Sequence, residues 1–187
     1  LFVAVQAIRL AQHGRALRRY RQTLSHEIPL PLYTAMAQAR EEAGVRRPVQ
    51  VAMSEARVVP LTFGWRRPVV VVPRLLLDQP DALRAALLHE LAHVRHGDFV
   101  WQAVERGLLC LFGWHPLFTW LHRHLDRARE LARDAEVLAR PGISPRRYAE
   151  LLLHFAAPAP SPVFAVGMAK PENPLNERIS AMKNAKD

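Results

Sequence analysis

Cysteine is almost absent from this chain of 187 residues, which contains only Cys110. One thiol can form neither an internal disulfide nor a zinc site built from thiolates. The sequence therefore excludes a disulfide-stabilised scaffold and a zinc finger, and it agrees with a reducing compartment. The length and the 50% hydrophobic content predict one domain with a substantial core.

The chain also lacks a block of like charges, although its formal net charge at pH 7 is +9. Its arginines are scattered among carboxylates, which is more typical of a solvated basic surface than of a nucleic-acid-binding patch. We therefore expect no direct contact with nucleic acid.

Long apolar runs are missing as well, since none reaches the roughly 20 residues that a helix needs to cross a bilayer. The opening residues 1–10 are apolar but short, and basic residues crowd this part of the chain: Arg9, Arg15, Arg18, Arg19 and Arg21. Arginines that flank an apolar segment mark the cytoplasmic side of a membrane. Because neither Met nor a signal peptide opens the sequence, we expect residues 1–24 to be the end of a longer membrane helix and a basic juxtamembrane helix.

Breaker residues and apolar periodicity divide the remaining chain into helices and short strands. The pattern predicts helices over residues 11–24, 32–44, 78–97, 116–140 and 145–157, and strands over 48–53, 57–63 and 69–72. Pro60, Pro68 and Pro73 would each remove a ladder donor, so the strands beside them should be short or lie at a sheet edge. These elements indicate an α+β fold that is mainly helical with a small sheet.

Two stretches near the end of the chain need separate expectations. Residues 107–121 contain no Asp, Glu, Lys or Arg, which predicts a buried helix or one that touches lipid. Residues 158–187 are expected to form a loop and a short helix, beginning at Asn173, that leads out of the domain.

One predicted helix carries a motif typical of metal chemistry, His89-Glu90-x-x-His93. Four residues advance about 400° along a helix, so both imidazoles project from one face and can bind one ion. Zinc accepts neutral imidazole nitrogen and, in catalytic sites, keeps one position for water. Glu90 would reach that water rather than the metal and act as the catalytic base. The motif therefore predicts a Zn²⁺-dependent hydrolase.

A second pattern, Glu130-x-x-x-Asp134, lies on a later helix that can pack antiparallel to the first. Glu130 would be the third metal ligand. Asp134, one turn further on, can accept the free ring N–H of a zinc-bound histidine and fix its tautomer. The alternative is an exposed helix face whose carboxylates have neighbouring arginines.

Two further residues are candidates for this site. Asp98, just past the motif helix, is either a carboxylate behind a metal ligand or a surface residue. His115, in Trp-His-Pro, is preferred over His122 and His124 as the group that stabilises the oxyanion formed when water attacks a peptide carbonyl.

These strings resemble the BlaR/MecR family of membrane-embedded metallopeptidases, which is related to HtpX-type and prenyl-protein proteases. The resemblance rests on residues 88–98, 114–116 and 129–134, preceded by Thr62-Phe-Gly64 and the proline-bounded residues 67–73. It covers residues 45–157 and implies a zincin-like (gluzincin-like) peptidase domain over residues 25–157. The small sheet would pack beside the His-Glu-x-x-His helix.

The resemblance also implies partners and a location. The domain would lie on the cytoplasmic side of the cell membrane, anchored through flanking helices, and would cleave a protein or peptide. The best-known members sense β-lactams outside the cell and cleave a transcriptional repressor inside, which links the family to signal transduction and antibiotic resistance. These residues contain no β-lactam-binding domain, so the resemblance does not transfer a sensing function. A homodimer is an open alternative.

By analogy with related zinc peptidases, the strand formed by Val69, Val70, Val71 and Val72 would lie at the sheet edge and hold the substrate backbone in extended form. Arg133 departs from the family pattern, since many members have a small residue or Cys there. The departure leaves the ligands intact.

Three functions stay open at this point. The first is zinc-dependent cleavage of a cytoplasmic protein in response to a signal, and the second is HtpX-like quality control of membrane proteins. The third is a signalling module that binds zinc without cleaving anything. The presence of Glu90 argues against the third, because a structural zinc site does not need a carboxylate beside an open position.

Overall fold

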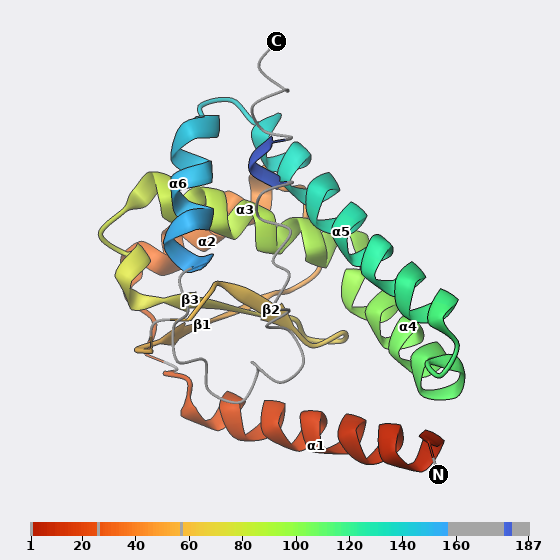
Figure 1. Ribbon diagram of the computed structural model, residues 1–187. Coiled ribbons are helices and arrows are strands. Elements are labelled where there is room, and N and C mark those ends of the chain that lie inside the picture. The colour runs from red at the N-terminus through yellow and green to blue at the C-terminus, as the bar shows by residue number, and fades with distance from the viewer. Residues whose placement is uncertain (1, 26, 57, 157–177, 181–187) are drawn as a thin grey trace.

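The computed structural model describes residues 2–25, 27–56, 58–156 and 178–180 (Figure 1). The elements follow in the order α1 (Phe2–Thr23), α2 (Leu30–Glu42), β1 (Gln50–Ser54), β2 (Leu61–Phe63), β3 (Val69–Pro73), the 3₁₀ turn η1 (Arg74–Leu76), α3 (Pro80–His96), α4 (Asp98–Phe112), α5 (Pro116–Leu138) and α6 (Pro145–Ala156). The fold is α+β, mainly helical with one three-stranded sheet, which confirms the predicted fold class.

Helix α3 lies at the centre of the molecule, between the sheet and the helices α2, α5 and α6 (Figure 1). Its side chains Leu87 and Leu91 are fully buried. They belong to a core cluster that also contains Val70 and Val72 from the sheet and Val137 from α5. The main core therefore forms around the helix that carries the metal-binding motif.

Strand β3 is the central strand of the sheet, whose order is β1-β3-β2. It pairs in parallel with β1 and antiparallel with β2, and all of its residues are buried. The prediction that residues 69–72 form an edge strand is therefore wrong. Pro68 precedes the strand and Pro73 ends it, so neither proline removes a donor from the middle of the ladder.

The two faces of the sheet are covered by different parts of the chain. Val69 and Val71 alternate with the core-facing valines and pack with Tyr20 and Leu24, at the end of α1. Helix α1 thus passes across the face of the sheet opposite α3 (Figure 1).

Glycines end two of the helices at the predicted positions. Gly97 (φ 67°) caps α3 in the left-handed conformation, and Gly44 (φ 68°) follows α2. Because α4 begins at Asp98, this single glycine is the whole connection between α3 and α4.

The uncharged stretch 107–121 is not one helix. It spans the end of α4, a turn at Gly113 and the start of α5, and most of its large side chains are exposed: Leu108, Leu111, Phe112, Trp114, Leu117, Trp120 and Leu121. The expectation that this stretch is buried is therefore wrong, whereas contact with lipid stays a prediction.

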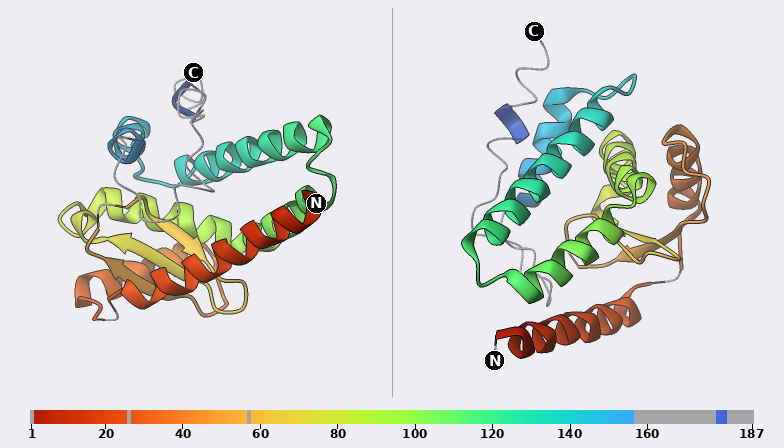
Figure 2. Two further views of the ribbon diagram at one scale, coloured as in Figure 1. Left: turned by 60° about the horizontal axis from the view of Figure 1, so that its bottom comes forward. Right: turned by 90° about the vertical axis from the view of Figure 1, so that its right-hand side faces the viewer.

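The beginning of α1 lies beside the turn between α4 and α5 (Figure 2). A Cβ atom placed on Gly113 would come within 3.3 Å of the Phe2 ring, which shows how close the two segments are. Two apolar segments more than 90 residues apart in sequence therefore meet at one end of the molecule.

No helix in the described part of the chain is both long and apolar enough to cross a membrane.

The predicted loop at residues 158–162 and the helix start at Asn173 lie outside the described residues. In this last part of the chain the structure describes residues 178–180, which are helical.

The position of Leu87 in the core leads to a prediction about stability. Leu87→Ala should lower the free energy of unfolding by about 2–5 kcal/mol, because it leaves a cavity in a fully buried site. Leu111→Ala, at a side chain that is 53% exposed, should change it by less than about 0.5 kcal/mol. Urea denaturation of both variants measures the difference, and equal losses would contradict the described core.

Candidate metal centre

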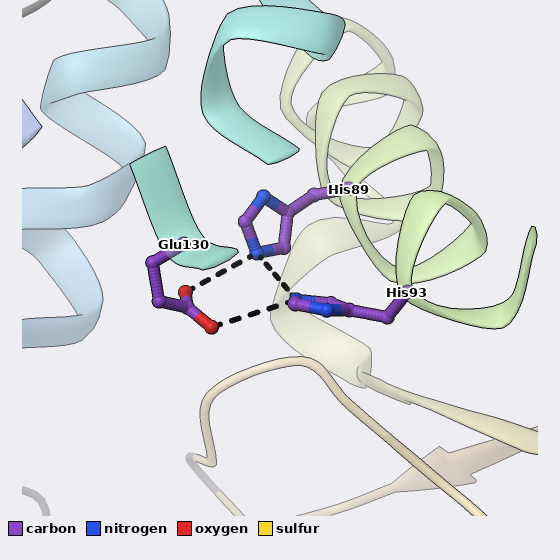
Figure 3. A group of neighbouring side chains, drawn as sticks. All are labelled: His89, His93 and Glu130. Atoms are coloured by element: carbon purple, nitrogen blue, oxygen red, sulfur yellow. Dashed lines mark hydrogen bonds and ion pairs between the residues drawn. The ribbon is translucent and has the colours of Figure 1, made fainter. Parts of the chain in front are cut away.

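The two histidines of α3 lie one helical turn apart and aim the same ring nitrogen at one point (Figure 3). The Nε2 atoms of His89 and His93 are 3.1 Å apart, and their ring planes are nearly perpendicular. Both side chains are largely buried, so packing restricts them to this arrangement.

Helix α5 packs across α3 and brings Glu130 to the same point (Figure 3). Its Oε2 atom is 3.6 Å from His89 Nε2, and its Oε1 atom is 3.6 Å from His93 Nε2. Donor atoms that bind one tetrahedral zinc ion at about 2.0 to 2.1 Å lie about 3.3 Å from one another. The observed separations lie on either side of that value, so the three side chains fit one zinc ion.

The described residues contain a second group of similar composition, Glu105, His122 and Asp126 on α4 and α5. Arg129 forms ion pairs with both carboxylates of this group. Because a guanidinium already occupies them, these residues form an ionic network rather than a metal site.

The second ring nitrogen of His89 faces two buried partners. Its Nδ1 atom is 3.2 Å from Asp134 Oδ1 and 2.9 Å from the hydroxyl of Tyr148, which in turn donates to Asp134 at 2.8 Å. A proton on Nδ1 that points to these oxygens leaves the Nε2 lone pair free for a metal. Asp134 therefore lies where the predicted role requires, whereas Tyr148 on α6 was not predicted.

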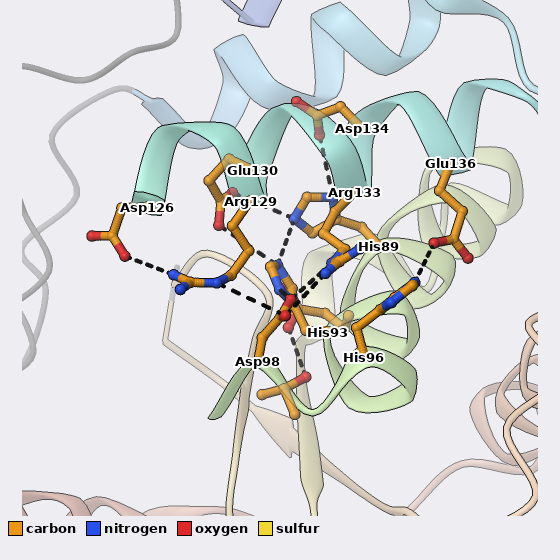
Figure 4. Close-up of polar contacts among 12 residues, drawn as sticks. His89, His93, His96, Asp98, Asp126, Arg129, Glu130, Arg133, Asp134 and Glu136 are labelled. Atoms are coloured by element: carbon orange, nitrogen blue, oxygen red, sulfur yellow. Dashed lines mark hydrogen bonds and ion pairs between the residues drawn. The ribbon is translucent and has the colours of Figure 1, made fainter. Parts of the chain in front are cut away.

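The second ring nitrogen of His93 is held in the same way by the first residue of α4 (Figure 4). His93 Nδ1 is 2.7 Å from Asp98 Oδ2, and the Asp98 side chain is buried. Arg133 donates to both oxygens of Asp98, at 2.8 and 2.9 Å. Asp98 is therefore a buried carboxylate behind His93 rather than a surface residue, and Arg133 makes a contact that the sequence did not reveal.

Glu90 points toward the sheet and is buried. The hydroxyl of Thr62, the middle residue of β2, donates to Glu90 Oε2 at 2.7 Å. Thr62 was not predicted as a site residue, although it belongs to the Thr-Phe-Gly string that carries the family resemblance. Strand β2 and helix α3 therefore hold Glu90 from two sides.

Arg178, in the helical turn 178–180, contacts the group from the last part of the chain. Its Nε and Nη2 atoms donate to the two oxygens of Asp134 at 2.6 and 2.7 Å, and its Nη1 atom is 3.2 Å from Glu130 Oε2. Sequence reasoning missed this residue, because a lone arginine 44 positions from its partner gives no signal.

His115 is not part of the site. It caps the start of α5, where its Nδ1 atom accepts from the backbone N–H of Leu117, and its ring lies against Trp114 and Phe118. Since a helix rises 1.5 Å per residue, the stretch of α5 up to Glu130 places this end about 20 Å away. The prediction that His115 stabilises the oxyanion is therefore wrong.

Carboxylates dominate the electrostatics of the site. Burial lowers the pKa of the His89 imidazole, but hydrogen bonds with Asp134 and Glu130 and the charges of Glu130 and Glu90 raise it to about 10 overall. Burial raises the pKa of Glu130, but His89, His93 and Arg178 lower it to about 2. Without a metal, the His89 imidazole is therefore positively charged at neutral pH, with a proton on each ring nitrogen. A divalent cation must displace one of these two protons to bind.

The group of His89, His93 and Glu130 could hold a metal ion. Together with Glu90 beside the first histidine, it has the arrangement typical of a metallopeptidase. The family described as BlaR1 peptidase M56 matches this chain over residues 1–182. The chain therefore belongs to the BlaR1 peptidase family.

Curated relatives agree with this assignment. The chain is 27% identical over 100 residues to "Regulatory protein BlaR1" of Bacillus licheniformis, which is 53% of this chain and 17% of the relative. It is 33% identical over 85 residues to "Protease HtpX" of Stutzerimonas stutzeri and 32% identical over 85 residues to that of Pseudomonas entomophila, covering 43% of this chain and 29% of each relative. The chain thus spans less than a third of the length of these relatives.

The raised pKa of His89 predicts how the zinc-free protein responds to pH. A folded-state pKa of about 10, above the ordinary value of 6.5, gives a stabilisation that is fully present below pH 6.5 and is lost as the pH rises toward 10. With a chelator present, the thermal midpoint of the wild type should fall between pH 7 and 10 more steeply than that of His89→Gln. Scanning fluorimetry of both proteins measures this, and parallel curves would count against a protonated His89.

Proposed function

We propose that this chain is the zinc-dependent endopeptidase part of a membrane-anchored signalling protease. The observation that carries the proposal is the convergence of His89, His93 and Glu130 on one point, with Glu90 on the same helix. When bound there, zinc would supply Lewis-acid polarisation of a peptide carbonyl and of the attacking water.

The position of Glu90 suits a general base. One of its oxygens, Oε2, accepts from Thr62, which leaves Oε1 to take a proton from water. The same carboxyl group would then deliver that proton to the nitrogen of the leaving amine, as peptide hydrolysis requires. Asp134 and Asp98 would meanwhile keep the Nδ1 protons of His89 and His93 in place.

The free edge of β2 is the proposed binding site for the substrate backbone. Among the described strands, β2 pairs only with β3, so its other edge has no strand partner. The Thr62 hydroxyl on this strand donates to Glu90, which supports a position of β2 close to the proposed base. An extended peptide that adds to β2 would carry its scissile bond past the metal centre. We therefore propose β2, instead of the central strand β3, as the strand that binds the substrate backbone.

The exposed apolar end of the molecule supports the proposed membrane association. It comprises the start of α1 and the α4–α5 turn, with the exposed side chains Val3, Val5, Ile8, Leu10, Leu108, Leu111, Phe112, Trp114, Leu117, Trp120 and Leu121. A patch of this kind marks an interaction site, and tryptophans favour the boundary between lipid and water. The arginines of α1 support the proposal that this boundary lies on the cytoplasmic side, and we propose that the peptidase domain begins at about residue 25.

The proposed membrane contact predicts binding to lipid vesicles. The triple variant Trp114→Ser, Leu117→Ser, Trp120→Ser should bind vesicles of mixed neutral and anionic lipid at least tenfold more weakly than the wild type, because it removes three apolar contacts. Leu30→Ser with Tyr33→Ser, on the exposed face of α2, is the matched control and should bind like the wild type. Co-sedimentation measures both, and equal binding of all three proteins would contradict the contact.

Two classes of substrate are candidates. The name "Regulatory protein BlaR1" fits a regulatory role, for which we propose a cut in a cytoplasmic protein such as a transcriptional repressor. The alternative, by resemblance to the relatives named "Protease HtpX", is quality control of membrane proteins. A single cut in one protein of the cell, found by comparing protein fragments with and without the active enzyme, favours the first. Degradation of many misfolded membrane proteins favours the second.

Glu90→Gln tests the proposed chemistry. The variant should keep zinc, because Glu90 is not a ligand, and should lose about 10²- to 10⁴-fold in turnover of quenched fluorescent peptides, because no base remains. Glu55→Gln, at an exposed carboxylate, is the control and should keep full activity. Undiminished cleavage by Glu90→Gln would rule out the proposed base. Absence of cleavage in the wild type, with signalling intact in Glu90→Gln, would favour a zinc-binding module that does not cleave.

A further inference from the structure

Each candidate ligand histidine contacts an aspartate, and each of these aspartates contacts an arginine. His93 contacts Asp98, which accepts from Arg133. His89 contacts Asp134, whose two oxygens accept from the guanidinium of Arg178. The two series of contacts are alike, but only the second depends on a residue from beyond α6.

Arg178 differs from Arg133 in one further contact. Its third nitrogen, Nη1, lies 3.2 Å from Glu130 Oε2, the carboxylate that would bind the metal. Glu130 and Asp134 are one turn apart on α5, where two negative charges repel each other. A single guanidinium bridges them and offsets that repulsion.

The burial of Arg178 shows that this contact is part of the packed site. Its side chain is only 13% exposed, and Asp134 is 4% exposed. Burying a guanidinium is unfavourable unless its donors are matched by acceptors in good geometry. All three of its nitrogens face the two carboxylates, so the guanidinium is held against this face of α5.

We propose that Arg178 is a positioning residue, which sets the affinity of the centre for zinc by holding Glu130 and Asp134 in the geometry that the ligands need. This inference rests on the proposed metal centre. Without the guanidinium, Glu130 and Asp134 would move apart, so that one ligand and the orientation of His89 would be lost together. The smallest active form of the chain therefore extends at least to residue 178.

The test compares Arg178→Ala and Arg178→Lys with Arg147→Ala, which removes an arginine from an exposed ion pair with Asp81. Zinc affinity is measured by competition with a chromogenic chelator, and the fold is checked by circular dichroism with and without zinc. Arg178→Ala should bind zinc about 10- to 100-fold more weakly, as is usual when a partner of a metal ligand is removed. Arg147→Ala should stay within twofold of the wild type.

Arg178→Lys separates charge from geometry and serves if the alanine variant does not fold. An ammonium keeps the charge but cannot donate two parallel hydrogen bonds to Asp134, so zinc binding should be weakened at least threefold. Combining Arg178→Ala with Asp134→Asn should cost less than the product of the two single losses, because both remove the same contact.

Wild-type zinc affinity in both Arg178 variants would overturn the proposal. So would losses that multiply independently with that of Asp134→Asn. These outcomes are distinct from failure of the proposed peptidase function, which would appear as a wild-type protein that binds one zinc ion but cleaves nothing.

Discussion

Two imidazoles with their Nε2 atoms 3.1 Å apart in a largely buried site are the constraint on which the rest of this structure depends. Each needs a partner for its second nitrogen, and a buried aspartate fills that position in both cases. Buried carboxylates in turn require cations, which Arg133 and Arg178 provide. The polar partners that this face of α3 requires therefore come from α4, α5, α6 and the helical turn 178–180.

The arrangement of the helices satisfies these requirements with few connections. Gly97, in the left-handed conformation, turns the chain within one residue, so that Asp98 at the start of α4 folds back onto His93. Helix α5 then returns across α3 with Glu130 and Asp134 on one face. The apolar faces of α3, α5 and the sheet meet in the same core, so the packing that fixes these helices also fixes the positions of Glu130 and Asp134.

The site combines residues that share one helix with residues from separate elements, and this difference explains what could be predicted from the sequence. His89, Glu90 and His93 are related by the pitch of one helix, and the pair Glu130 and Asp134 by the pitch of another, so local periodicity was sufficient to suggest them. The remaining partners come from separate elements and are defined only by tertiary packing: Thr62, Tyr148 and Arg178. Two of the three wrong predictions, the edge position of residues 69–72 and the role of His115, have the same origin. Proline positions do not reveal strand order, and the neighbourhood of His115 in the sequence says nothing of its distance from the metal site.

Helix α5 joins the exposed apolar end of the molecule to the candidate metal centre. Its first turns carry the exposed Leu117 and Trp120, and its later turns carry Glu130 and Asp134. A continuous α-helix is stiff, so the apolar end and the metal centre are held about 20 Å apart. With the apolar end docked in a membrane as proposed, the metal centre would lie within about 20 Å of the lipid contact. An extended segment that leaves the membrane, or a soluble protein at its surface, could bring its scissile bond to that distance.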